Sequence, residues 1–227
     1  MSAFPDPAAD EATLPGLAPL ASAAPDLALA AGYAVAWIAP RALSPGVMRI
    51  LLVSLLLEFI VLHSAAFMGN VAFAPGPRPA AMRRVLGLGV FYTLFVGGFA
   101  LAFHAAWPLV SFWALTLNRA TVVLIGRAPD GAQRRVVSAT WGATAMCYLF
   151  GVMLTVVLPI PRLGCTPDVV SAMRLPGHGL WVAQPWRAMA FGALYFAAVA
   201  AFELFAAPRI AASAATAESA PPARAAA

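Results

Sequence analysis

The chain has 227 residues and a net charge of +5, and it combines 62% hydrophobic residues with only 10% charged ones. A soluble domain carries about a quarter charged residues and cannot bury this much apolar surface, so the composition excludes an ordinary soluble fold. It also argues against a nucleic-acid-binding protein, because the 14 basic residues, all arginines, are scattered between apolar runs and do not cluster in one segment.

The N-terminal region divides into a polar tail and a short apolar stretch. Residues 1–24 are rich in Ala and Pro and lack the basic start of a secretory signal peptide, so we expect a disordered tail. The stretch 27–39 has only about 13 residues, fewer than the ~20 that a crossing needs. Tyr33 and Trp37 suit the headgroup region. An interfacial or re-entrant helix and a short sixth crossing both stay open.

Five longer apolar runs are each able to cross a bilayer. They lie at about 47–68, 85–104, 109–125, 138–158 and 188–207. Because a helix satisfies its own backbone hydrogen bonds in lipid, the sequence predicts an all-α polytopic transmembrane helical bundle within 25–208, followed by a disordered tail at 209–227. The second and third runs should form a tight hairpin that ends at Pro108.

Arginine distribution indicates the orientation of the spans. Five arginines fall on one side of the predicted membrane, namely Arg41, Arg49, Arg162, Arg174 and Arg187. Eight fall on the other side, namely Arg78, Arg83, Arg84, Arg127, Arg134, Arg135, Arg209 and Arg224. The positive-inside rule places the second group, and with it the C-terminus, in the cytoplasm. The use of Arg as the only basic residue, with abundant Ala and Pro, is typical of a GC-rich genome, so we expect a multi-pass protein of a bacterial inner membrane.

The loop at 159–187 is the largest extramembrane segment in this prediction. Thr166, Pro167 and Asp168 are typical of the cap and first turn of a short helix. His178 lies between Gly177 and Gly179, where its ring could approach a ligand.

Small residues recur along two of the predicted spans. They are Ala139, Ala143, Cys147, Gly151 and Thr155 on the fourth span, and Gly89, Thr93 and Gly97 on the second. Such seams let neighbouring helices approach closely, and packing is a better explanation of Cys147 than a reactive thiol. We expect no disulfide between Cys147 and Cys165.

Polar residues inside the spans are the most informative feature of the sequence, since burying an ionisable group in lipid costs a few kcal/mol. Depth along the spans places five of them between the midplane and the cytoplasmic face, and these form the predicted polar cluster: Glu58, His63, Asn118, Arg119 and Glu203. A carboxylate and a guanidinium at similar depth should pair. The sequence therefore predicts an ion pair of Arg119 with Glu58 or Glu203.

Histidine chemistry is sparse, because the chain has only 3 histidines. That number is too small for a membrane di-iron enzyme, and His63 and His104 lie at different depths, which disfavours a haem between them. His178 could bind a metal with Cys165 and Asp168, but a lone loop histidine is usually just solvated. We expect no metal site and no cofactor.

The leading functional hypothesis is a non-enzymatic integral membrane protein, either an accessory subunit or a small transporter. The alternative is an intramembrane enzyme that uses Glu58 or His63 as acid or base and Arg119 to bind an anionic group. A polar pocket lined by several of these residues would favour the alternative. The expected partners are the lipid bilayer and a membrane-protein partner or a second copy of the chain, and not nucleic acid.

Overall fold

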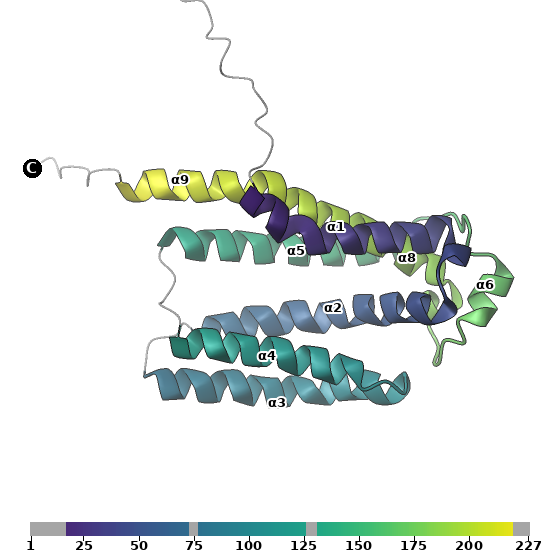
Figure 1. The fold of residues 1–227 in the computed structure, drawn as a ribbon, viewed down its shortest axis with the longest axis horizontal. Coiled ribbons are helices and arrows are strands. Elements are labelled where there is room, and N and C mark those ends of the chain that lie inside the picture. Colours follow the sequence, from purple (N-terminus) through teal and green to yellow (C-terminus); the bar gives the residue numbers. More distant parts are fainter. Residues whose placement is uncertain (1–16, 73–76, 126–130, 220–227) are drawn as a thin grey trace, which may run out of the picture.

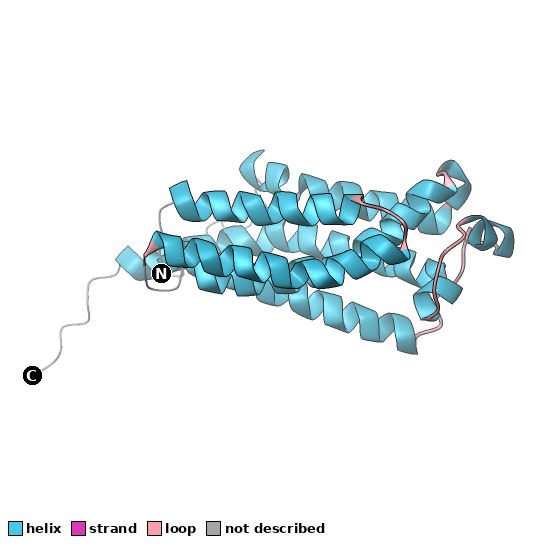
Figure 2. Ribbon diagram, turned by 90° about the horizontal axis from the view of Figure 1, so that it is seen from below, coloured by secondary structure: helices cyan, strands magenta, loops and turns pink. Residues whose placement is uncertain are grey.

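The computed structural model describes residues 17–72, 77–125 and 131–219, and within these ranges all regular structure is helical. The long helices lie side by side and alternate in direction along one axis (Figures 1 and 2). The prediction of an all-α bundle is confirmed for the described residues.

Six long helices form the body of the bundle: α1 (Leu17–Ile38), α2 (Pro45–Ala72), α3 (Arg78–Ala102), α4 (Trp107–Ile125), α5 (Gly131–Val157) and α8 (Pro185–Ala201). A π-helical turn, η3 (Phe202–Ala206), continues α8 into α9 (Ala207–Ser219). The connections hold the short helices η2 (Pro40–Ala42), α6 (Pro167–Ala172) and α7 (Leu180–Ala183). The predicted hairpin between α3 and α4 and the short helix after Thr166 are both confirmed.

Five helical segments are long and apolar enough to cross a membrane: Pro19–Ile38, Pro45–Ala72, Arg78–Ala102, Arg134–Val157 and Pro185–Ala214. This set identifies a multi-pass membrane protein by length and composition, but it differs from the predicted set. It includes α1, for which the sequence predicted only the short stretch 27–39 with a sixth crossing left open. The predicted run at 109–125 corresponds to helix α4. At a rise of about 1.5 Å per residue, α1 is about 33 Å long.

The predicted disordered tails overlap helices at both ends of the chain. Residues 17–24 form the start of α1, and residues 209–219 belong to α9. The remainder of both tails, 1–16 and 220–227, lies outside the described residues. Helix therefore occupies 17–24 and 209–219 of the segments predicted as tails.

Helix α2 is the element shared by two packed groups. One of its faces packs with α1, α5 and α8 around Leu52, Tyr148 and Phe191. Another packs with α3 and α4 around Val85 and Phe112. Figure 1 shows the same division, with α3 and α4 on one side of α2 and α5, α8 and α1 on the other.

Glycines mark the closest helix contacts. A Cβ on Gly151 would lie 2.2 Å from the Phe191 ring of α8, and one on Gly89 would lie 2.9 Å from Thr116 of α4. These contacts confirm the predicted small-residue seams at those two points. At Gly97, however, an added Cβ would meet nothing within 4 Å, so the second seam does not extend that far.

Aromatic side chains from α1 and α5 donate hydrogen bonds to backbone carbonyls of α2. The hydroxyl of Tyr33 donates to the Leu51 carbonyl. The hydroxyl of Tyr148 donates to the Leu55 carbonyl at 2.9 Å, and the Trp141 indole donates to the Leu62 carbonyl at 3.1 Å. Interhelical hydrogen bonds of this kind stabilise packing in lipid, where apolar burial between helices contributes little. They fix the rotation of α2 against α1 and α5.

Candidate functional site

The centre of the candidate site is the contact between Glu58 on α2 and Tyr195 on α8. The Tyr195 hydroxyl donates to the Glu58 Oε1 atom at 2.9 Å. Tyr195 is only 2% exposed, so the bond is shielded from solvent on the α8 side. Glu58 also lines a cavity of about 120 Å³ between α2, α3 and α4, together with Ser54 and Ser111. The carboxyl group thus has a fixed donor on one side and a small space on the other.

Three of the four tyrosines of the chain surround Glu58. The rings of Tyr148 and Tyr195 meet edge to face, with centroids 5.4 Å apart. Tyr33 reaches the same region through Phe196, which stacks on Tyr33 at 5.5 Å and contacts Tyr195 at 4.8 Å. Both Tyr33 and Tyr148 interact electrostatically with Glu58. The carboxyl group is therefore embedded in hydroxyl-bearing rings from three helices.

Two further carboxyl groups lie near this centre. Glu203, in the π-helical turn η3, accepts a hydrogen bond from the Ser22 hydroxyl of α1 at 3.1 Å. Asp26 follows Ser22 by four residues and so lies one turn further along the same face of α1. Asp26 interacts electrostatically with both Glu203 and Glu58. We call Asp26, Glu58 and Glu203 the carboxylate cluster.

The depths of the three carboxyl groups are graded along the bundle axis. Counted from the end that holds α6, at about 1.5 Å per residue, Asp26 lies about 18 Å along α1 and Glu58 about 20 Å along α2. Glu203 lies about 27 Å along α8 and η3, closer to the opposite end. Ser22, beside Glu203, is exposed, whereas Tyr195 beside Glu58 is buried. The carboxylate cluster thus lies between the exposed hydroxyl of Ser22 and the buried hydroxyl of Tyr195.

The predicted pairing of Arg119 is wrong. Neither Glu58 nor Glu203 forms an ion pair with it, and its Nη1 atom instead lies 3.5 Å from both Ser64 Oγ and Met68 Sδ on α2. The reason is the level at which Arg119 contacts α2. Ser64 and Met68 lie 6 and 10 residues beyond Glu58, whereas Glu58 accepts its hydrogen bond from Tyr195 of α8.

The other predicted polar residues have separate surroundings. His63 Nδ1 shares a hydrogen bond with the Phe59 carbonyl at 2.8 Å, and its ring lies on the Phe59 ring with centroids 4.0 Å apart. Asn118 is exposed on the surface of α4. Of the predicted polar cluster, only Glu58 and Glu203 therefore come together in the carboxylate cluster. Asp26 was missed because it lies between the predicted tail 1–24 and the predicted apolar stretch 27–39, although its spacing from Ser22 was visible in the sequence.

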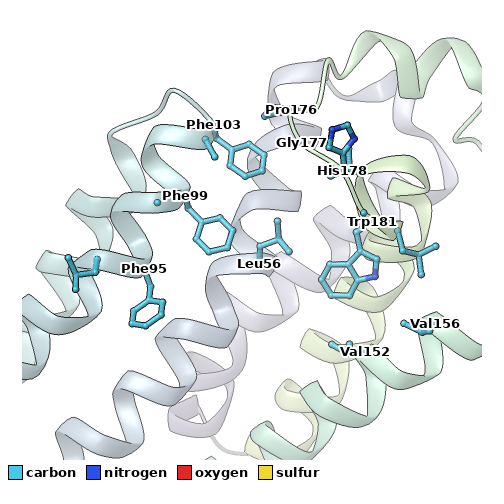
Figure 3. A pocket seen from close by; sticks show the side chains of 16 residues that line it. Leu56, Phe95, Phe99, Phe103, Val152, Val156, Pro176, Gly177, His178 and Trp181 are labelled. Atoms are coloured by element: carbon cyan, nitrogen blue, oxygen red, sulfur yellow. The ribbon is translucent and has the colours of Figure 1, made fainter.

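The outer-loop candidate His178 is exposed and lines a groove between α3 and α5 (Figure 3). Its neighbours Gly177 and Gly179 have φ angles of 86° and 128°, which favour glycine. The two residues considered as metal partners are engaged elsewhere. Cys165 donates to the Ala36 carbonyl of α1 at 3.4 Å, and Asp168 pairs with Arg41 at 2.9 Å. These contacts anchor the loop on α1 and η2 instead of forming a site with His178.

The Asp168 carboxyl should titrate below its usual range. The neighbouring Thr166 side chain and the hydrogen bond and charge of the Arg41 guanidinium lower the pKa of Asp168. Because the folded-state pKa is lowered, this stabilising contribution is present at neutral pH and is lost as the pH falls through the lowered pKa. Both partners are exposed, so the effect on total stability is small.

Replacing Arg41 by Gln should raise the pKa of Asp168 toward the ordinary value for Asp. Carbon-detected NMR of the carboxyl group in detergent micelles measures this pKa directly. Arg174→Gln is the matched control, because Arg174 lies in the same loop and forms no ion pair with Asp168. An unchanged pKa in Arg41→Gln would show that this ion pair does not persist in solution.

Comparison with known proteins found no matching family model, no similar curated protein and no similar solved structure. The fold and the site therefore define a class only: a multi-pass helical membrane protein, by length and composition of its helices, with carboxyl groups gathered inside the bundle.

Proposed function

We propose that the protein is a small proton-coupled transporter of a bacterial inner membrane, in which the carboxylate cluster takes up and releases protons. The observation that carries the proposal is the convergence of Asp26, Glu58 and Glu203 from three separate helical elements. None of the described arginines pairs with these carboxyl groups. Among the described residues, the cluster is accordingly built from acids and hydroxyls.

Electrostatics makes such a cluster suited to proton exchange. Charges inside the bilayer cost several kcal/mol, and neighbouring like charges add repulsion. Protonation of a carboxyl group removes both the cost of burial and the repulsion. The number of protons bound to the cluster should therefore change when the three helices pack differently. Conversely, a change in protonation should bias how α1, α2 and α8 pack, which is the coupling that transport requires.

The π-helical turn at Glu203 supports the proposal that this part of the bundle changes conformation during transport. Single π-helical turns within long helices are often found at functional sites, since they disturb the regular backbone hydrogen bonds. The turn holds Glu203 opposite the exposed Ser22. Arginine distribution orients this end toward the cytoplasm, so we propose proton access from the cytoplasmic side.

The acid–base enzyme is the weaker alternative. It uses Glu58 or His63 as acid or base with Arg119 as the anion-binding group, but the cavity lined by Glu58 includes neither His63 nor Arg119. An accessory role for the protein, with a membrane-protein partner or a second copy, would not explain why three carboxyl groups lie close together in the bundle.

A pH jump on reconstituted protein tests the proposal without knowledge of the transported molecule. Proteoliposomes adsorbed on a solid-supported electrode should give a charge displacement when the pH is stepped. Glu58→Gln and Asp26→Asn should each reduce this displacement by about tenfold, because both remove a proton-binding group. Asp168→Asn, which removes an exposed acid outside the carboxylate cluster, is the control and should leave the signal unchanged.

Folding is checked separately by monodispersity and thermal unfolding of each variant. Well-folded Glu58→Gln and Asp26→Asn proteins that retain the wild-type charge displacement would overturn the proposal. A signal lost equally in Asp168→Asn would do the same, since it would place the proton exchange at the surface.

A further inference from the structure

A large apolar groove lies on the side of the bundle, apart from the carboxylate cluster. It has a volume of about 800 Å³, within the range of ligand sites, and is enclosed by α3, α5 and the segment that contains α7. Figure 3 shows side chains from all three sides pointing toward this space, and its lining includes Leu56, Phe95, Phe99, Phe103, Val152 and Trp181.

The groove runs along the depth of the bilayer and opens sideways. Phe95, Phe99 and Phe103 follow one another at intervals of four residues, so they extend about 12 Å along the axis of α3. Both α3 and α5 are helices that are long and apolar enough to cross a membrane. A lateral opening between two such helices faces hydrocarbon chains, and not water.

The rim of the groove is polar and lies at a positively charged end of the molecule. His178 is exposed there, between Gly177 and Gly179, which both have positive φ angles. Among the described residues at this end, Asp168 is the one acid, and it is outnumbered by five arginines: Arg41, Arg49, Arg162, Arg174 and Arg187. This excess of positive charge favours an anionic group at this end of the molecule through long-range attraction, and none of the five arginines itself lines the groove.

We propose that this groove binds a phospholipid with an anionic headgroup, its acyl chain lying along Phe95, Phe99 and Phe103 and its phosphate at the His178 rim. The apolar walls match the chain, the lateral opening gives access from the bilayer, and the surplus of arginine matches the headgroup. The inference is independent of the carboxylate cluster and of the proposed transport.

Two adjacent glycines of α3 provide a matched test. Gly98 lines the groove and Gly97 does not, and an added Cβ would meet nothing within 4 Å at either position. Gly98→Phe should therefore fill the groove without disturbing helix packing, whereas Gly97→Phe should leave the groove open. Each purified variant is incubated in micelles with equal amounts of phosphatidylglycerol and phosphatidylcholine, and retained lipid is counted by native mass spectrometry.

Wild-type protein and Gly97→Phe should retain phosphatidylglycerol in preference to phosphatidylcholine, and Gly98→Phe should lower its apparent affinity about tenfold. His178→Ala should lower the preference for phosphatidylglycerol while retaining total lipid. Equal retention by Gly98→Phe and Gly97→Phe would overturn the proposal. So would a wild-type dimer that Gly98→Phe dissociates without loss of lipid, because the groove would then be an interface between copies.

Discussion

Replacing Gly192 by Val should destabilise the protein by about 3 kcal/mol, at the upper end of the usual cost of overpacking. A Cβ at this position would lie 2.4 Å from Cδ1 and 2.6 Å from Cγ of the Tyr33 ring. Tyr33 has no room to retreat, since its side chain is completely buried and its hydroxyl is bound to the Leu51 carbonyl. The substitution must therefore separate α1 from α8.

Unfolding by denaturant in bicelles measures this change in the free energy of unfolding. Gly97→Val is the matched control, because an added Cβ at Gly97 meets no atom within 4 Å. It should change the free energy of unfolding by no more than about 0.5 kcal/mol. Similar losses in the two variants would show that helix propensity, and not the contact with Tyr33, determines the effect.

The membrane-crossing helices could be predicted where the apolar run is uninterrupted. Helices α2, α3, α5 and α8 were found in this way, but α1 was shortened, because Ser22, Pro25 and Asp26 interrupt its apolar pattern. In the structure Ser22 donates a hydrogen bond to Glu203, and Asp26 lies one turn further along the same face of α1. A hydropathy pattern cannot detect such a helix, since it counts polar residues without knowing what they contact.

The candidate site was predictable only in part, since Glu58 and Glu203 belong to it whereas Arg119 contacts α2 6 and 10 residues beyond Glu58. Counting residues along each span placed Glu58 and Arg119 in the same half of the membrane. It could not show that α4 packs on the opposite side of α2 from α8, a fact that depends on helix rotation and neighbour order. For the same reason the Tyr195 hydroxyl was not identified as the donor to Glu58, although Tyr195 was visible within an apolar run.

The coupling of Glu58 to Tyr195 should be measurable, and that of Glu58 to Arg119 should be absent. In a double-mutant cycle of Tyr195→Phe and Glu58→Met, we expect an interaction energy of about 1 kcal/mol or more in the free energy of unfolding. Tyr195→Phe removes only the donor, and Glu58→Met keeps the side-chain length while removing the carboxyl acceptor. The same cycle with Arg119→Gln in place of Tyr195→Phe should give an interaction energy near zero.

The two cycles decide between alternative positions of the Glu58 carboxyl group. A strong interaction with Tyr195 alone places it on the α8 side, within reach of Asp26 and the rest of the carboxylate cluster. A strong interaction with Arg119 instead would place the carboxyl on the α4 side and restore the ion pair expected from depth matching. In that case a cation would neutralise Glu58, and the carboxylate cluster would lose the protonation behaviour that proton coupling requires.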